Sequence, residues 1–194
     1  MTTAIQYLKR NEIDIVKWNA CIEKNNGLIY GYSWWLDNMS AHWDALILND
    51  YEAVMPLTWK KKYGFYYLYQ PFFTASLGLF ANTHAISIAD FLRAVPSKFR
   101  FWDIDISEAN ILPEPVSVAA LTVHKRLNLF LDLQKNHSDL ISQYSRLTRR
   151  SLEKSHKHNL VIVYNDTPED IIALYRKSYH TAHPRITNKD YHAL

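Results

Sequence analysis

Glycine is scarce in this chain, and its scarcity limits which ligand-binding loops the chain can form. Only Gly27, Gly31, Gly64 and Gly78 occur among 194 residues. Their spacing does not fit a Walker A loop, a GxGxxG dinucleotide-binding loop or a glycine-rich acetyl-CoA loop, so these three ligand-binding loops are excluded. A Gly-x-Ser-x-Gly nucleophile elbow is also absent, which removes the main support for a hydrolase.

The composition is that of a globular protein with a substantial core. Apolar residues make up 48% of the chain and aromatic residues 14%, which suits one domain or a domain and a half. The single cysteine, Cys21, cannot form an internal disulfide, so a reducing compartment is the simplest setting. No apolar run reaches the roughly 18 residues of a membrane span, and no signal peptide is visible. We therefore expect a cytoplasmic protein without a membrane span.

The first hundred residues alternate between helical and strand-like patterns. Segment 14–24 places Ile15, Trp18 and Ile22 on one helical face. Further helices are expected from Ser33 and over 88–95, where Pro96 ends the pattern. Strands are expected over residues 5–8, 43–49, 52–59, 65–73 and 101–107.

Turn signals connect several of these strands. Asn49 and Asp50 are good hairpin residues between the second and third strands. Pro56 suggests a sheet edge or a bulge. The three lysines 60–62 are expected to form a turn with Tyr63 and Gly64.

The remaining residues predict a strand, helix, strand, helix succession. In the segment 126–134, leucines at 127, 129, 131 and 133 share one face at a period of two. A long helix is expected from Ser138 to about His158, then a strand over 161–164. Thr167, Pro168 and Asp170 predict the start of a last helix through His180. The inward-facing residues of these two helices are expected to be Leu140, Ile141, Tyr144, Leu147, Leu152, Ile171, Leu174 and Tyr175. The order indicates an α/β protein of the α+β kind.

Basic side chains form a stripe on the expected long helix. Arg146, Arg150, Lys154 and Lys157 follow one another at spacings of four, four and three, and Arg149 lies beside them. Such a stripe attracts phosphate or carboxylate groups, because arginine forms bidentate contacts with anions. The ordinary alternative is a solvated helix face.

Other candidate residues carry weaker signals. Lys60 and Lys61, in a basic cluster beside aromatic residues, would either grip a phosphate or only solubilise a loop. Trp35 belongs to an aromatic group that would line a sugar or base pocket, or simply pack in the core. The group consists of Trp34, Trp35, Tyr63, Tyr66, Tyr67 and Tyr69.

Metal binding and nucleophilic catalysis have little support. The histidine pairs at 156 and 158 and at 180 and 183 lack companion acids or cysteines spaced as in a zinc site. Asp103 and Asp105 share a strand face and are expected to be exposed polar residues rather than paired catalytic carboxylates. Cys21 is expected to be buried in the core. No metal and no catalytic residue is assigned.

The segment from Leu127 to Arg185 resembles a stretch of the Fem-type aminoacyltransferases, a branch of the GNAT acyltransferase superfamily. Three parts carry the resemblance: a strand that ends in Asp132, a helix with the pair Arg149–Arg150 and Lys154, and a final helix that begins with an acidic cap. The segment GLIYGYSWWLDNM and the phrase MPLTWKKKYG in the N-terminal half also look like these proteins. Ser151, Glu153, Ser155 and Asn159 depart from the pattern.

The resemblance implies a GNAT-like fold, a twisted, mostly antiparallel mixed sheet flanked by helices and normally repeated as two fused domains. Residues 1–165 would form one such domain. Residues 166–194 would be a helical segment that leads towards a second domain absent from this chain, and a homodimer would be one way to replace it.

The resemblance also implies transfer of an acyl or aminoacyl group to an amine acceptor. The donor would be acyl-CoA or aminoacyl-tRNA and the acceptor a nucleotide-sugar precursor, with no cofactor held within the chain. The substrate-binding residues would be Arg146, Arg149, Arg150, Lys154, Lys60, Lys61 and Trp35. The alternative is a non-catalytic module that binds RNA or an anionic glycan through the basic helix.

Overall fold

The protein is described by a computed structural model. It describes residues 4–25, 28–81, 86–110, 121–129, 131, 134–158, 160–161, 164, 167–179 and 186–193. Contacts between residues divide the chain into two compact units. Unit 1 comprises residues 1–123 and 184–194, and unit 2 comprises residues 124–183. The boundary expected from the resemblance, between residues 165 and 166, stays a prediction.

Unit 1 is built on a mixed, mostly antiparallel sheet in which the strands pair in the order β1-β2-β3-β4-β6, while the short β5 pairs with β3. Among the strands of the described residues, β4 and β6 form a parallel pair and the other pairs are antiparallel. The strands are β1 (Ile5–Lys9), β2 (His42–Leu48), β3 (Ala53–Lys62), β4 (Phe65–Tyr69), β5 (Phe80–Ala81) and β6 (Phe99–Asp103). This architecture confirms the α+β class and the mixed, mostly antiparallel sheet.

Two tight connections set the register of the central strands. Residues 49–52 join β2 to β3, and Asn49 has a positive φ of 49°. A two-residue turn joins β3 to β4, with φ of 50° at Tyr63 and 85° at Gly64, as turns that match the strand twist require. The turn prediction for lysines 60–62 is wrong, because Lys60, Lys61 and Lys62 are the last residues of β3 and pair with Tyr67, Tyr66 and Phe65.

Pro56 lies inside the ten-residue β3 rather than on an edge strand. It pairs with Ala45 of β2. On the other side of β3, β5 pairs only with residues 53–54, and β4 only with residues 59–62. Pro56 therefore occupies the gap between two short neighbours, where the missing backbone N–H costs no ladder hydrogen bond on that side.

The helices of unit 1 begin largely where the sequence indicates. Asp14 caps α1 by accepting hydrogen bonds from the backbone N–H groups of Val16 and Lys17, at 3.0 and 3.1 Å. Ser87 caps α3 in the same way through Ala89. The helical elements are η1 (Arg10–Glu12), α1 (Ile15–Lys24), η2 (Ile29–Gly31), α2 (Ser33–Met39), α3 (Ile88–Ala94) and α7 (Asn188–His192).

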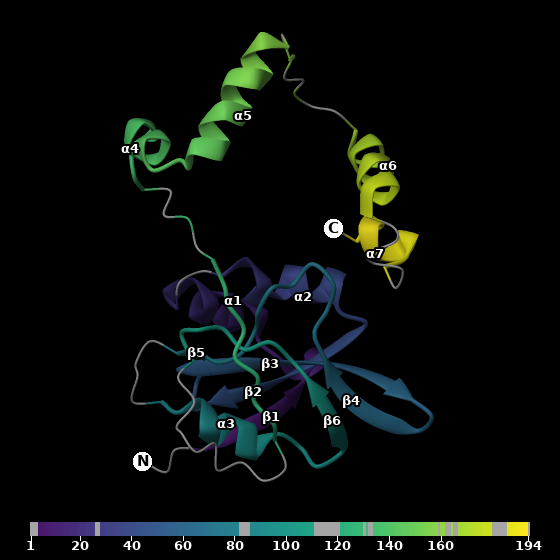
Figure 1. Ribbon diagram of the computed structural model, residues 1–194. Coiled ribbons are helices and arrows are strands. Elements are labelled where there is room, and N and C mark those ends of the chain that lie inside the picture. Colours follow the sequence, from purple (N-terminus) through teal and green to yellow (C-terminus); the bar gives the residue numbers. More distant parts are fainter. Residues whose placement is uncertain are drawn as a thin grey trace. The chain divides into compact units, whose positions relative to one another are not determined.

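Helices cover both faces of the sheet (Figure 1). Trp18 and Ile22 of α1 and Leu36 of α2 pack with Trp43, Ala45 and other residues on one face. On the opposite face, Phe91 and Leu92 of α3 pack with Leu46, Met55 and Leu68. The core thus has two apolar layers, one on each side of the central strands.

The strand predicted over residues 101–107 is displaced towards the N-terminus. β6 covers Phe99–Asp103, and its pairing with β4 shifts register between Tyr66 and Tyr67. Ile104 and Ile106, which follow β6, are partly buried and pack against the core. Ile106 also forms an isolated parallel β-bridge with Leu77.

Unit 2 contains three helices within its described residues: α4 (His137–Ser142), α5 (Arg146–Lys157) and α6 (Pro168–Tyr179). The prediction of a single long helix from Ser138 to His158 is wrong. Residues 143–145 are not helical and separate α4 from α5. Ser145 starts a new helix by accepting a hydrogen bond from the Thr148 N–H at 3.1 Å. The start predicted for the last helix is confirmed, since Thr167 and Asp170 hydrogen-bond each other beside Pro168.

The strands predicted in unit 2 are not found in its described residues. Residues 126–129, 131 and 134 form no strand, and Leu127, Leu129 and Leu131 are 89, 83 and 71% exposed. Val161 and Tyr164 also lie outside strands, while Leu133 and residues 162–163 lie outside the described residues. Alternating leucines would share one face of a strand, but a strand also needs a neighbouring strand to form hydrogen bonds with its backbone N–H and C=O groups.

The helices of unit 2 do not bury the residues predicted to face inward. Six of the eight predicted residues are exposed, and Leu140 and Tyr175 are half-buried. The exposed fraction is 76% for Leu147 and 66% for Leu174. No described residue between 124 and 183 is buried, so the predicted packing is not found within unit 2.

Candidate functional site

The predicted basic stripe lies on α5 and is exposed along its whole length. Ser145 caps the helix, and Arg146, Arg150, Lys154 and Lys157 follow at helical spacing. Within the described residues none of these four side chains forms an ion pair. Their charges are therefore available to phosphate or carboxylate groups of a ligand.

Arg149 is engaged differently from its neighbours. Its guanidinium donates hydrogen bonds to the backbone carbonyls of Ser142 and Tyr144, at 2.6 and 3.1 Å. These oxygens belong to the end of α4 and to the joint before α5, where helix carbonyls lack partners. Arg149 thus braces the joint between the two helices, a contact that the helical spacing alone could not indicate.

Lys60 and Lys61 lie in unit 1, on opposite faces of β3. The Lys60 ammonium lies 4.2 Å from the centroid of the Tyr69 ring, and that of Lys61 lies 4.9 Å from the Tyr66 ring. Cation–π contacts of this kind stabilise exposed sites modestly. Each lysine therefore lies against an aromatic ring of the neighbouring strand β4, and the two pairs lie on opposite faces of the sheet.

Trp35 anchors the loop that follows β4. Its Nε1–H donates to Thr74 Oγ1 at 3.0 Å, and its ring makes edge contacts with Tyr30 and Trp34. The half-buried indole therefore holds a loop in place. Its predicted role in substrate binding stays a prediction.

A buried carboxylate in unit 1 has no counterpart in the sequence-based predictions. Asp44, whose side chain is 7% exposed, accepts hydrogen bonds from the Tyr7 hydroxyl and the Arg10 N–H. Lys98 Nζ donates to the Tyr7 hydroxyl at 2.6 Å and lies 3.7 Å from Asp44 Oδ2. Tyr7, Asp44 and Lys98, here named the carboxylate cluster, join β1, β2 and the residue before β6.

Aromatic rings surround the ammonium of this cluster. Lys98 Nζ lies 4.7 Å from the ring centroid of Tyr7 and 4.8 Å from that of Phe99, with the Trp59 and Tyr66 rings within 6 Å. Burial, and then the hydrogen bond to Asp44, raise the pKa of Tyr7 well above its ordinary value. The Tyr7 hydroxyl therefore stays protonated at neutral pH, where it donates a hydrogen bond to Asp44 and accepts one from Lys98.

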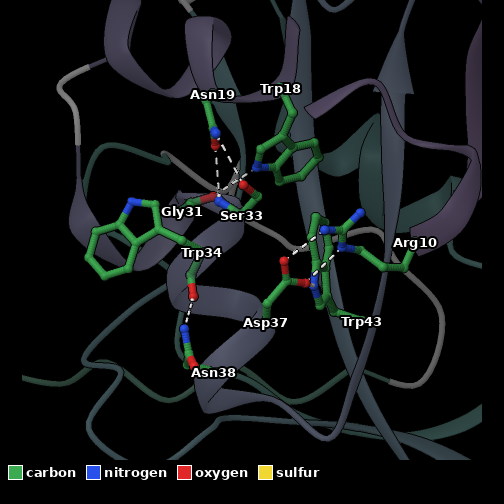
Figure 2. A network of polar contacts seen from close by, with 9 residues as sticks. All are labelled: Arg10, Trp18, Asn19, Gly31, Ser33, Trp34, Asp37, Asn38 and Trp43. Carbon is green, nitrogen blue, oxygen red and sulfur yellow. Dashed lines mark hydrogen bonds and ion pairs between the residues drawn. The ribbon is translucent and has the colours of Figure 1, made fainter. Parts of the chain in front are cut away.

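A second polar network ties α2 to the sheet (Figure 2). The Arg10 guanidinium donates two hydrogen bonds of 2.7 Å to Asp37, and the Trp43 indole donates a third at 2.8 Å. The hydrogen bond from Arg10 lowers the pKa of the Asp37 carboxyl. Nearby, Asn19 and Ser33 exchange hydrogen bonds between α1 and α2. The network fixes the helices on the sheet.

Cys21 and the two aspartates near the end of β6 lie in different surroundings. Cys21 is 4% exposed, as predicted, and burial raises the pKa of its thiol, which opposes formation of the nucleophilic thiolate. Asp103 is exposed at the end of β6. The backbone N–H of Asp105 donates to Gln70, and its carbonyl accepts from Leu77.

The described residues contain no group of three histidine, cysteine, aspartate or glutamate side chains that could hold a metal ion. His156 and His158 are exposed on α5 and after it, and His180 and His183 lie outside the described residues. Among the helices of the described segments, none is long and apolar enough to span a membrane.

The structure separates the predicted site residues into two groups. Lys60, Lys61 and Trp35 lie in unit 1, and the arginines and lysine of α5 lie in unit 2. Comparison of the chain with protein-family models, with curated proteins and with solved structures finds no match.

Proposed function

We propose that this protein is related to acyltransferases and takes part in the transfer of an acyl or aminoacyl group to an amine, as Fem-type enzymes do. The basic stripe of α5 would hold the anionic portion of a substrate. The observation that carries the proposal is the exposure of Arg146, Arg150, Lys154 and Lys157 on one helix without an ion pair in the described residues.

Two further features support the transferase part of the proposal. The mixed, mostly antiparallel sheet of unit 1, with helices on both faces, is of the kind that the resemblance implies. The basic pair Arg149–Arg150 and Lys154, which carries the motif, lies on a regular helix. The proposal rests on this combination of motif, sheet and exposed charge.

In this proposal the protein contributes position and charge rather than a nucleophile. Arginine side chains bind phosphate oxygens in a bidentate fashion and fix their orientation. Holding the donor beside the acceptor amine would accelerate the reaction by proximity, and the cations would stabilise negative charge. Arg149 would serve the same site indirectly, because it braces the start of α5.

The test is calorimetric binding of acyl-CoA, a UDP-linked muramyl peptide and a tRNA to the whole chain and to the double variant Arg146→Ala/Arg150→Ala. One ligand is expected to bind saturably, and the double variant is expected to weaken it by at least about tenfold, since a hydrogen bond to a charged group contributes roughly 1.5–3 kcal/mol. Acceptor acylation with the bound donor then tests the transfer itself.

The matched control is Arg176→Ala/Lys177→Ala, which removes two exposed charges from α6. An equal loss in this control would mean that net charge, and not the stripe, governs binding. Unchanged affinity in the α5 variant would remove the site assignment. If tRNA alone binds, without preference among sequences and with steep salt dependence, and Arg146→Ala/Arg150→Ala removes that binding, the protein is the non-catalytic RNA-binding module of the alternative hypothesis.

A further inference from the structure

One end of the sheet in unit 1 carries aromatic and basic side chains on the same face. Strand register pairs Lys62 with Phe65, Lys60 with Tyr67, and Tyr67 with Phe101. Directly paired residues point to the same side of a sheet, and residues two apart on one strand do so as well. Lys60, Lys62, Phe65, Tyr67 and Phe101 therefore share one face of β3, β4 and β6, here named the hairpin face.

The hairpin face is left open although its reverse side is packed. Phe65 is 58% exposed and Phe101 is 69% exposed, whereas Leu68, on the reverse side, is 1% exposed. The reverse side packs Leu68, Trp59 and Tyr66 into the core cluster of α3. Neither core cluster includes a residue of the hairpin face. Figure 1 shows the β3–β4 hairpin reaching beyond α1, α2 and α3.

The charge on this face is positive close to the rings. The Lys60 ammonium lies over the Tyr69 ring at 4.2 Å, and Lys62 lies 5.3 Å from the ring centroid of Tyr63, which is 88% exposed at the turn. Within the described residues, neither lysine forms an ion pair. Asp103, paired with Tyr69, is the acidic residue of this face and limits the basic surface at that end.

We propose that the hairpin face binds single-stranded RNA. Unpaired bases stack on Phe65, Tyr67 and Phe101, and the phosphates lie against Lys60 and Lys62. Aromatic rings on a sheet provide flat surfaces for bases, and nearby cations hold the backbone. An apolar protein partner would match the rings but would leave the two lysines facing apolar surface, which is costly for charged groups.

RNA fits this face better than DNA because of the tyrosines. The exposed Tyr63 and the half-buried Tyr67 carry hydroxyl groups that can donate to or accept from the ribose 2′-hydroxyl. The 2′-hydroxyl is the group that distinguishes RNA from DNA at a binding site. The hairpin face belongs to unit 1 and the α5 stripe to unit 2, and binding on the hairpin face depends on stacking rather than on charge alone.

The experiment measures fluorescence anisotropy of a labelled oligouridine of about 12 nucleotides, a length within the range of known single-strand sites, with the whole chain. The variant Phe65→Ala/Phe101→Ala is expected to weaken binding at least about tenfold, because stacking contributes roughly 1–3 kcal/mol per base. Lys60→Ala/Lys62→Ala is expected to reduce the slope of log affinity against log salt by about 1.4, at roughly 0.7 per phosphate contact. The matching DNA strand is expected to bind severalfold more weakly.

Two controls separate this proposal from the proposed function. Tyr164→Ala removes an aromatic residue of unit 2 that is 79% exposed and is expected to leave RNA binding unchanged. Arg146→Ala/Arg150→Ala removes two of the four charges of the α5 stripe and is expected to leave the stacking contribution intact. Tryptophan fluorescence checks the fold of the variants, since all six tryptophans lie between residues 18 and 102.

Three results would overturn the proposal. They are absence of RNA binding by the whole chain, unchanged binding in Phe65→Ala/Phe101→Ala, and a loss confined to the α5 variant. Equal affinity for the RNA and DNA strands would overturn the assignment to RNA.

Discussion

The two units of this chain place similar apolar patterns in very different surroundings. In α1 of unit 1, Trp18 and Ile22 lie four residues apart and are fully buried against the sheet. In α5 of unit 2, Leu147 is 76% exposed and Leu152 is 42% exposed. Both helices have a capped N-terminus. They differ in their apolar residues, since α1 buries a continuous apolar side against the sheet of its own unit, whereas α5 has two leucines five positions apart in a unit without a strand among its described residues.

The same contrast holds for strand-like segments. Leu46 and Leu48 of β2 are 0 and 3% exposed because β1 and β3 flank them and α3 covers them. Leu127 and Leu129 alternate in the same way and remain exposed. Periodicity therefore defines which side chains share a face, while burial requires a neighbouring element that removes that face from water.

The largest effect is expected from removing a ring from the core of unit 1. Phe91, on α3, is fully buried. Phe91→Ala removes the free energy gained by burying the ring and leaves a cavity, so we expect the free energy of unfolding to fall by about 3–5 kcal/mol. The matched change in unit 2, Leu147→Ala, is expected to change the free energy of unfolding by less than about 0.5 kcal/mol. Chemical denaturation followed by tryptophan fluorescence for unit 1 and far-ultraviolet circular dichroism for both units measures the difference.

Two outcomes would contradict these expected effects on stability. A large destabilisation by Leu147→Ala would mean that unit 2 buries this leucine against a partner in solution. A small effect of Phe91→Ala would mean that the core around α3 collapses around the missing ring or is loosely packed.

A smaller effect is expected from neutralising the buried member of the carboxylate cluster. Asp44→Asn keeps the shape but weakens two hydrogen bonds and removes the counter-charge of Lys98. Hydrogen bonds to charged groups contribute roughly 1.5–3 kcal/mol, and we expect a loss in that range. Urea unfolding at neutral pH, monitored by tryptophan fluorescence, gives the value.

Asp50→Asn is the control for this prediction. Asp50 forms an ion pair with Lys17 at 2.5 Å, but its side chain is 77% exposed, so its removal is expected to leave the free energy of unfolding almost unchanged. Equal losses in the two variants would show that burial of Asp44 adds nothing to its interactions.

Much of unit 1 could be predicted from local sequence, because its signals are short-range. Asp14 and Ser87 begin helices by capping them, and Asn49 lies in the hairpin connection that its type favours. A run of three lysines is typical of loop composition, so the sequence predicts a turn at residues 60–62. In the structure the two residues with positive φ, Tyr63 and Gly64, make the turn alone.

The candidate sites were less predictable, because their parts are distant in the sequence. The basic stripe follows from helical spacing within one segment. The carboxylate cluster instead joins Tyr7 to Asp44 across 37 positions and to Lys98 across 91, and a single sequence contains no local signal of such pairs. The role of Arg149 depends on a helix break at Gln143–Ser145, which continuous periodicity conceals.

The smallest effect concerns the partly exposed pair of Arg10 and Asp37, and it is a dependence on pH. Arg10 lowers the pKa of Asp37 in the folded protein, so the unfolded chain binds the proton more readily. The contribution of the pair is therefore complete above the ordinary carboxyl pKa of about 4 and is lost as the pH falls through the folded pKa. Because both side chains are more than a third exposed, at 36 and 41%, we expect less than about 1 kcal/mol.

The measurement is the difference in free energy of unfolding between the protein and Asp37→Asn from about pH 6 to about pH 2, which should shrink as the pH falls. Arg10→Met is the paired control, since it removes the other half of the same contact and should show no additional loss when combined with Asp37→Asn. Added salt should reduce the difference at neutral pH by screening the pair. A difference that stays constant with pH would mean that folding does not favour the ionised form of the Asp37 carboxyl over its neutral form, and it would contradict the contacts of the carboxylate with Arg10 and Trp43 as the source of the lowered pKa.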